Sequence, residues 1–348
     1  MAMETERKDA AAILSVEHLS TSFFTSNGRV NAVRDVSFSL RQGEMLGIVG
    51  ESGSGKTVSS LSILQLLGGS GRITDGKIIF DGTDLVSAPK KQLRNVRGAR
   101  IAMVFQDPMS SLNPLMPVGR QIGEMIKTHQ PKIKADELRS EVLRLLGLVH
   151  IPEPEKRYHS YPHEFSGGMR QRVMIAIALA CKPDVLIADE PTTALDVTIQ
   201  DQILKLLRSL RDEFQTSVIF ITHDLGVVAE LCSRVIVMYG GKIMEEALVD
   251  DLYENPAHPY TMGLLASVPN VAQDKQKRLQ SIPGSPPDMI RPPAGCPFAP
   301  RCSYARNICG AQEAPRIQVG ESHFSRCWLW VPEAPAENNP FRKAGGEA

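Results

Sequence analysis

The sequence lacks an excess of charge of either sign, a long apolar run and a secretory signal. Its 348 residues include 39 Lys and Arg against 39 Asp and Glu, so no net field draws the protein to nucleic acid or to an anionic membrane surface. The apolar run from Val173 ends before Lys182, short of the roughly 20 residues that cross a bilayer as a helix. Charged residues such as Glu4 and Arg7 precede any apolar run, which is not the order of a secretory signal. We therefore expect a soluble or peripheral protein that remains in the cytoplasm.

Cysteine is scarce and proline is unevenly distributed. The chain has six cysteines, and in a reducing cytoplasm we expect no framework of disulfides. In contrast, 14 of the 24 prolines fall between Pro256 and Pro340. Proline interrupts helices and removes ladder hydrogen bonds from sheets. This segment is therefore predicted to be a loop-rich extension, without long helices or a sheet-rich second domain.

A glycine-rich stretch after a short apolar run is the most specific motif. Met45 to Val49 is predicted to be a buried strand, and the residues after it match the phosphate-binding pattern G-x-x-x-x-G-K-[ST]. In such a loop, backbone N–H groups and the following helix N-terminus face phosphate oxygens. The lysine reaches the β- and γ-phosphates, and the final hydroxyl binds Mg²⁺. The alternative is a glycine-rich turn that binds no ligand. The predicted phosphate-binding residues are Gly50, Glu51, Ser52, Gly53, Ser54, Gly55, Lys56 and Thr57.

A second apolar strand, Val185 to Ala188, is followed by the carboxylates of Asp189 and Glu190. A parallel strand delivers the side chains at its carboxyl end to the crevice where phosphates bind. We expect Asp189 to hold Mg²⁺ through its water shell, and Glu190 to polarise the attacking water as general base.

Strands and helices alternate after the phosphate-binding loop. This order predicts an α/β fold with a mainly parallel core sheet, an antiparallel β subdomain and a helical subdomain inserted at about residues 107–181. The predicted strands are residues 13–24, 36–40, 45–49, 76–82, 100–105, 185–188 and 217–222, with 235–238 pairing with 242–244.

Four more stretches complete a resemblance to the ATP-binding-cassette ATPases of the P-loop NTPase class. Phe165 to Arg172 resembles their signature loop, and Ala194 to Asp196 resembles their D-loop. Gln106 is similar to their Q-loop glutamine, and His223 to their switch histidine. All occur in the family's order. The resemblance covers residues 12–250, after an N-terminal tail of residues 1–11, and departs from the family at residue 169, where methionine replaces the usual glutamine and cannot donate a hydrogen bond.

The resemblance implies a head-to-tail dimer with two ATP molecules at its interface. Ser166, Gly167 and Gly168 would bind the γ-phosphate of the nucleotide held by the partner's loop, as a second anion site at a helix N-terminus. Gln106 and His223 would join Glu190 as catalytic residues, with Gln106 also a ligand of Mg²⁺. Phe23 would stack on adenine, with Phe24 as the alternative.

Two further stretches, residues 105–114 and 255–261, resemble the ATPases of oligopeptide and dipeptide permeases. Members of that group carry a C-terminal extension like residues 251–348. The resemblance implies an ATPase that energises a membrane importer, for which we expect di- or oligopeptides, with nickel, glutathione or opines as alternatives.

That resemblance also implies the partners and the location. The partners are a second ATPase subunit (itself or a paralogue), two transmembrane permease subunits and an extracytoplasmic solute-binding protein. No nucleic acid is expected. The location is the cytoplasmic face of the bacterial inner membrane, where the protein would be peripheral.

Two other classes of function fit the sequence less well. Cassette ATPases that act on nucleic acid or ribosomes carry two cassettes or a long coiled-coil insertion, and this chain has one uninterrupted cassette. A module that binds ATP without hydrolysing it is opposed by the presence of Glu190 and His223.

Four cysteines lie close together in the extension. Cys296, Cys302, Cys309 and Cys327 are separated by five, six and seventeen residues, and the lack of a C-x-x-C pair argues against an ordinary zinc ribbon. Four thiolates can hold a [4Fe–4S] cluster, and some relatives have a similar pattern. A cluster, zinc and unligated thiols all remain open. The other two, at positions 181 and 232, are expected in the core.

Overall fold

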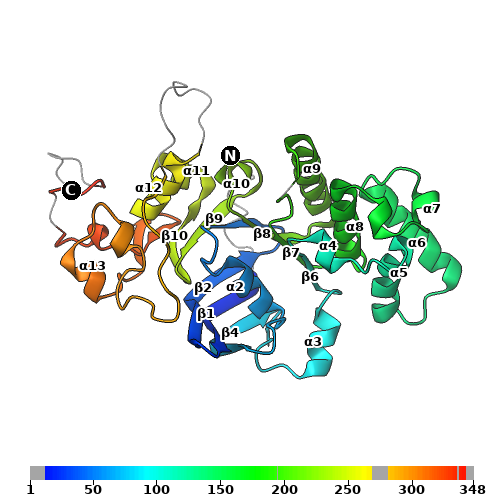
Figure 1. Cartoon of the computed structure of the whole chain (residues 1–348), viewed down its shortest axis with the longest axis horizontal. Helices are drawn as coiled ribbons and strands as arrows, with labels where there is room; N and C mark the ends of the chain where they lie inside the picture. Colours follow the sequence, from blue (N-terminus) through cyan, green and yellow to red (C-terminus); the bar gives the residue numbers. More distant parts are fainter. Residues whose placement is uncertain (1–11, 194, 269–280, 335–336, 342–348) are drawn as a thin grey trace. The chain divides into compact units, whose positions relative to one another are not determined.

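The computed structural model (Figure 1) describes residues 12–193, 195–268, 281–334 and 337–341. The predicted tail of residues 1–11 and Ala194 of the D-loop motif lie outside them. The described residues form two compact units. The first holds residues up to Leu14, Leu40–Met45 and Phe80–Ile221, and the second holds Ser15–Ser39, Leu46–Ile79 and the chain from Thr222 onward. Nowhere in the described chain is there a helix with the length and apolar character needed to cross a bilayer.

The first unit contains three parallel strands in the order β6, β7, β8. They are β6 (Ile101–Val104), β7 (Val185–Asp189) and β8 (Ser217–Thr222). Every residue of β7 and β8 is buried, as expected for parallel strands covered on both faces. Because parallel neighbours end at the same edge, the residues that follow β6 and β7 lie at a common edge.

Helices are inserted between β6 and β7, as the sequence predicts. Helices α5, α6 and α8 pack on one another, and α8 also contacts β6. Most apolar side chains from Val173 to Leu179 of α8 are buried, so this part of the helix lies inside the insertion. The elements of the insertion are α4 (Pro108–Ser111), α5 (Val118–His129), α6 (Ala135–Leu148), α7 (Pro154–Arg157), the 3-10 helix η2 (Pro162–Glu164) and α8 (Gly167–Leu179). The other elements of the unit are β5 (Thr83–Asp84), α3 (Lys90–Val96) and α9 (Val197–Phe214).

The second unit carries the strand that precedes the phosphate-binding loop. That strand, β3 (Met45–Val49), is parallel to β9 (Arg234–Tyr239), and β10 (Lys242–Leu248) returns antiparallel to β9. Helices α2 (Lys56–Ile63) and α10 (Leu225–Leu231) belong to the same unit. The predicted fold class, including the hairpin of β9 and β10, is confirmed.

A second sheet places β2 (Gly28–Arg41), β1 (Ala12–Thr25) and β4 (Gly71–Phe80) side by side in that order. The sequence predicted that β4 begins at Gly76, and this is wrong, because the strand begins five residues earlier and passes through that glycine. A Cβ atom there would lie 2.6 Å from the backbone oxygen of Glu17 in β1. The glycine therefore marks a close approach of two strands, not a turn.

The extension adds strands to the sheet of the second unit. Strand β12 (His323–Ser325) pairs antiparallel with β10, and β11 (Ile317–Gly320) pairs with β12. The sequence did not predict this pairing. The remaining elements are short, since proline is frequent: α11 (Val249–Glu254), α12 (Pro259–Ala266), η3 (Ala299–Arg301), α13 (Asn307–Ala311) and η4 (Trp328–Trp330).

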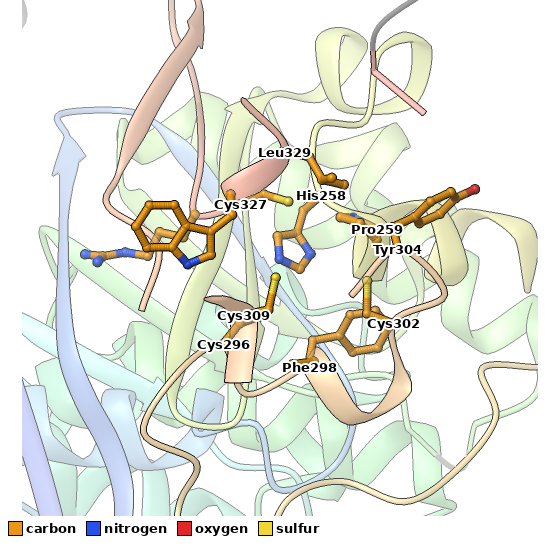
Figure 2. A pocket seen from close by; sticks show the side chains of 12 residues that line it. His258, Pro259, Cys296, Phe298, Cys302, Tyr304, Cys309, Cys327 and Leu329 are labelled. Carbon is orange, nitrogen blue, oxygen red and sulfur yellow. The ribbon is translucent and has the colours of Figure 1, made fainter. Parts of the chain in front are cut away.

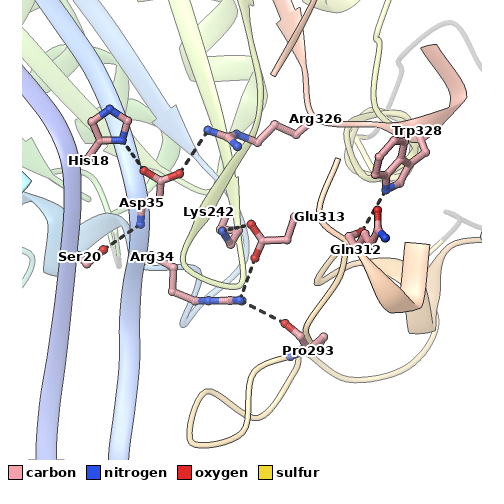
Figure 3. Close-up of polar contacts among 10 residues, drawn as sticks. All are labelled: His18, Ser20, Arg34, Asp35, Lys242, Pro293, Gln312, Glu313, Arg326 and Trp328. Carbon is pink, nitrogen blue, oxygen red and sulfur yellow. Dashed lines mark hydrogen bonds and ion pairs between the residues drawn. The ribbon is translucent and has the colours of Figure 1, made fainter. Parts of the chain in front are cut away.

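Ion pairs also connect the extension to β2 and β10 (Figure 3). The carboxylate of Glu313 accepts from Arg34 at 3.1 Å and from Lys242 at 2.6 Å. Arg34 also donates to the carbonyl oxygen of Pro293 at 3.2 Å. The Lys242 side chain is only 8% exposed, so this pair is less screened by solvent than a surface ion pair. The extension is thus joined to β2 and β10 of its own unit by backbone and side-chain contacts.

Candidate functional site

The glycine-rich loop lies between β3 and α2, as the sequence predicts. Gly50 has φ 150° and Gly55 has φ 103°, values that side chains other than glycine rarely adopt. A Cβ atom on Gly50 would lie 2.1 Å from the backbone oxygen of Met238, and one on Gly55 would lie 2.6 Å from that of Ala32. Only glycine fits at these two positions, which fixes the path of the loop.

The lysine of the loop is buried beneath it. The Lys56 side chain donates to the carbonyl oxygens of Gly50 at 2.7 Å and Glu51 at 3.0 Å, and Lys56 is 5% exposed. Ser52, Gly53 and Thr57 are exposed. The loop therefore offers backbone groups and a hydroxyl to solvent, while the lysine is held against its inner side.

The two carboxylates at the end of β7 differ in their surroundings. Asp189 is 2% exposed. Glu190 has φ 46°, a left-handed conformation that a non-glycine residue keeps only where the surrounding structure imposes it. Its Oε2 accepts from the Gln106 amide at 3.0 Å and from the Thr193 hydroxyl at 2.9 Å. These bonds fix one carboxylate oxygen at the edge where β6 and β7 end.

Residues of the signature motif begin helix α8. The Ser166 hydroxyl accepts from the backbone N–H of Met169 at 3.3 Å, which caps the helix. A Cβ atom on Gly168 would lie 2.5 Å from Cγ2 of Ile199 in α9, whereas one on Gly167 would meet nothing closer than 3.8 Å. The second glycine is therefore required by packing, and the first is exposed and sterically unconstrained.

The remaining predicted site residues are in the second unit. His223 is exposed directly after β8, and the neighbouring Asp224, not the histidine, caps α10. Phe23 packs against Gly71, with its ring 2.8 Å from the position of a Cβ there. Phe24 is 49% exposed.

The structure thus brings the predicted residues into two groups. The first unit holds Gln106, Asp189, Glu190 and the signature residues 166–168. The second unit holds the phosphate-binding loop, Phe23 and His223.

Two residues of the extension contact the phosphate-binding loop, and neither was predicted from the sequence. The hydroxyl of Tyr260 accepts from the backbone N–H of Glu51 at 2.9 Å. The guanidinium of Arg301 donates to the Glu51 carboxylate at 2.7 Å. Tyr260 lies in a stretch that carries the resemblance to permease ATPases, which was the only available signal. No local pattern marks Arg301.

The four cysteines of the extension line one pocket (Figure 2). His258 and Phe298 line it too. Burial raises the pKa of the thiols of Cys296 and Cys327 to about 12 and also raises that of Cys302, so these groups are neutral in the absence of a cation. Across the described residues, no three His, Cys, Asp or Glu side chains are close enough together to hold one metal ion. Cysteine thiols are the donors that an iron–sulfur cluster needs, but in this structure they are not close enough together to hold one.

Comparison with known proteins gives two family matches. The family described as "ABC transporter" matches residues 33–193. The family described as "Oligopeptide/dipeptide transporter, C-terminal region" matches residues 244–309, which include three of the four pocket cysteines. The matches thus cover part of the cassette and part of the extension.

Solved structures support the fold. A dimeric ATP-binding cassette in a post-hydrolysis state, bound to ADP and Pi, aligns with a TM-score of 0.62 and 27% identity over 68% of this chain and 98% of that one. The cbiO1 protein of Clostridium perfringens, part of an ABC transporter complex, aligns with a TM-score of 0.59 and 29% identity over 70% of this chain and 91% of that one.

Curated relatives match nearly the whole chain. The oligopeptide transport ATP-binding protein OppD of Bacillus subtilis is 52% identical over 329 residues, which are 94% of this chain and 92% of that protein. The dipeptide transport ATP-binding protein DppD of the same organism is 51% identical over 318 residues, 91% of this chain and 94% of that protein. The chain therefore belongs to the ATP-binding-cassette family, within its group of oligopeptide and dipeptide transport ATP-binding proteins.

Proposed function

We propose that this protein is the ATP-hydrolysing subunit of a membrane importer for di- or oligopeptides. The observation that carries the proposal is the 52% identity to an oligopeptide transport ATP-binding protein across 94% of the chain, extension included. The geometry agrees, since the loop, the carboxylates and the exposed histidine each occupy the ends of core strands. Nickel, glutathione and opines remain the alternative solutes.

In this proposal the phosphate-binding loop, Gly50 to Thr57, holds the ATP phosphates. Its exposed backbone N–H groups and the N-terminus of α2 supply the anion site. The Lys56 ammonium leaves the carbonyl oxygens that it now contacts and turns to the β- and γ-phosphates. Phe23 stacks on adenine, with Phe24 as the alternative.

Oxygen donors suited to Mg²⁺ are present in both units. The Asp189 carboxylate, the Thr57 hydroxyl and the Gln106 amide oxygen are the hard ligands that Mg²⁺ prefers. When bound, Mg²⁺ neutralises charge that develops on the phosphates. Glu190 then accepts a proton from the attacking water, and His223 contacts the γ-phosphate.

Hydrolysis is proposed to occur in a head-to-tail dimer with itself or with a paralogue. Ser166, Gly167 and Gly168 would reach the γ-phosphate held by the partner subunit, since they begin a helix and two of them are exposed. Closure on ATP and reopening after hydrolysis would drive the membrane subunits.

The proposed membrane partners are two permease subunits, supplied with solute by an extracytoplasmic binding protein. Large apolar side chains are exposed just after Gln106, with Met109 64% and Leu115 86% exposed. Exposed apolar residues near a catalytic glutamine suit a contact that transmits the state of the site. The protein would lie at the cytoplasmic face of the bacterial inner membrane.

The test is to purify the tagged protein from membranes of its own cells and reconstitute the complex in liposomes. We expect two permease subunits and a binding protein to accompany it, and ATP-dependent uptake of labelled peptide. The Lys56→Ala variant is the control and should assemble without transport. Uptake of nickel, glutathione or an opine instead of peptide would correct the solute, and recovery with ribosomes would contradict the importer.

We propose in addition that the four cysteines of the extension hold a [4Fe–4S] cluster. The supporting observation is that all four thiols, spread over 32 residues from Cys296 to Cys327, line one pocket. Ligation requires the thiols to draw closer than they are here. A cluster would then order this proline-rich segment, coupling metal binding to its folding.

The cluster is tested on protein purified without oxygen. We expect brown protein that contains iron and acid-labile sulfide, and bleaching when any one of the four cysteines is replaced by serine. Cys181→Ser, at a half-buried cysteine outside the extension, is the matched control and should retain the colour. Colourless anaerobic protein without iron would mean unligated thiols, or a zinc site if zinc is found instead.

A further inference from the structure

The side chain of Arg301 is enclosed by the loop and by the extension. It is 6% exposed. Its guanidinium donates to the Glu51 carboxylate at 2.7 Å, to the Tyr239 hydroxyl at 2.9 Å and to the carbonyl oxygens of Pro283 at 2.8 Å and Ile282 at 3.1 Å. All four partners belong to the second unit. Four acceptors around the planar guanidinium hold it in one orientation.

An aromatic cluster holds this arginine in place. Arg301 ends η3, and Phe298, directly before that helix, is 3% exposed. The Phe298 ring lies 5.4 Å from that of Tyr239 and 5.2 Å from that of Tyr260. The same Tyr260 accepts a hydrogen bond from the backbone N–H of Glu51. Side chain and backbone of Glu51 are therefore both bound by the extension.

Glu51 is an acidic residue in a loop that binds an anion. A carboxylate at the second position of the loop repels the phosphates of a nucleotide unless its charge is neutralised. Arg301 supplies that neutralising charge at 2.7 Å. Arg301 is nearly buried and Glu51 is only partly exposed, at 26%, so water screens the repulsion less than it would at an open surface.

We propose that Arg301 is a positioning residue for ATP: it neutralises Glu51 and fixes the first turn of the phosphate-binding loop in the form that accepts phosphate. This inference rests on the proposed ATPase function. It makes the extension a part of the nucleotide site, acting through Glu51 and not by contact with the nucleotide.

The test is steady-state ATP hydrolysis by the assembled transporter. Arg301→Gln leaves the Glu51 charge unpaired, so the KM for ATP should rise roughly tenfold while kcat stays within about twofold, because the effect is on nucleotide binding. Removing the charge as well, in Glu51→Gln with Arg301→Gln, should return the KM to within about twofold of the original. Arg291→Gln, at an exposed arginine of the same extension, is the control and should leave KM unchanged.

A merely structural role predicts a different pattern. If Arg301 only held the extension together, Glu51→Gln would not restore the KM, and limited proteolysis of the single and double variants would be equally faster than for the original protein. Should Arg301→Gln fail to fold, Arg301→Met removes the charge while keeping an unbranched stem beside Gly284, and it is measured in the same way. Absence of ATP hydrolysis by the original transporter would refute the proposed function, whereas normal hydrolysis with an unchanged KM in Arg301→Gln would refute this inference alone.

Discussion

The amide of Gln106 donates to the carboxylate of Glu190 at 3.0 Å, across the edge where the parallel strands β6 and β7 end. Both residues are therefore placed by the sheet and not by a flexible loop alone. The same oxygen of Glu190 also accepts from Thr193, so two donors fix the position of the carboxylate. A carboxylate held in this way is suited to accept a proton from water.

The first prediction is that Glu190→Gln retains Mg-ATP binding and slows turnover by roughly 10²–10⁴, the usual contribution of a positioned general base. Glutamine preserves the shape of the side chain and an oxygen for Gln106. The nucleotide-bound dimer should accumulate, as measured by size-exclusion chromatography with ATP. Glu137→Gln, in the first turn of α6, is the control for loss of one acidic charge. Near-normal hydrolysis by Glu190→Gln in the intact transporter would remove the residue from this role.

The second prediction separates two neighbouring glycines of the signature motif. A Cβ at residue 168 would lie 2.5 Å from Ile199, so Gly168→Ala should lower the free energy of unfolding by about 1–3 kcal/mol, the cost of overpacking. Gly167→Ala meets no close atom and should leave stability almost unchanged. If Gly167 approaches the γ-phosphate held by the partner subunit, Gly167→Ala should lose ATPase activity although its stability is almost unchanged.

Urea unfolding and ATP hydrolysis, measured on both variants, test this separation. Gly168→Ala should cost less stability when Ile199 is replaced by alanine, because that change removes Cγ2, the atom that the new methyl group meets. Equal stability losses at positions 167 and 168 would show that the contact with α9 is not the cause.

The third prediction concerns alkaline pH. Burial raises the pKa of Tyr253 to about 12, with smaller contributions from Asp224 and Cys232, and its hydroxyl donates to the carbonyl oxygen of Leu225. The folded state favours the neutral phenol, while the unfolded chain ionises near pH 10. The contribution of Tyr253 to stability is therefore complete below about pH 10 and falls by up to roughly 1.4 kcal/mol per unit as pH rises toward 12.

Urea unfolding at pH 8, 10 and 11 measures this dependence. Tyr253→Phe should be about 1 kcal/mol less stable at pH 8, for the lost hydrogen bond, and should lose less stability than the original protein between pH 10 and 11. Tyr161→Phe, at an exposed tyrosine directly before η2, is the control. Parallel stability curves for the original protein and Tyr253→Phe would contradict the prediction.

The parts of the site that the sequence predicted correctly are those encoded locally. A buried strand, a glycine loop and a helix follow one another within residues 45–63, so each is visible as a short pattern. The apolar run before Asp189 is local in the same way. The roles of these residues with ATP remain predictions, because they depend on a ligand and a partner subunit.

The features that the sequence could not predict are contacts between residues that lie far apart along the chain. The contact of Arg301 with Glu51 joins residues 250 positions apart, and no spacing rule relates them. Strand β12 is only three residues long, too short to show the alternation of side chains that marks a strand in a sequence. It is a strand because its backbone pairs with β10. The pocket of four cysteines likewise depends on how the extension folds back on itself.

The last prediction concerns the shared ATP sites of the proposed dimer. If Ser166 acts on the partner's nucleotide, Lys56→Ala in one subunit and Ser166→Arg in the other damage the same composite site and leave the second intact. Both changes in one subunit damage both sites. The measurement is ATP hydrolysis by purified dimers of two differently tagged copies, or with a paralogue carrying the matching change. We expect clear residual activity in the first arrangement and almost none in the second. Each single variant serves as a control for assembly, and equal activities of the two arrangements, with both sites known to be competent, would show that the sites are not shared.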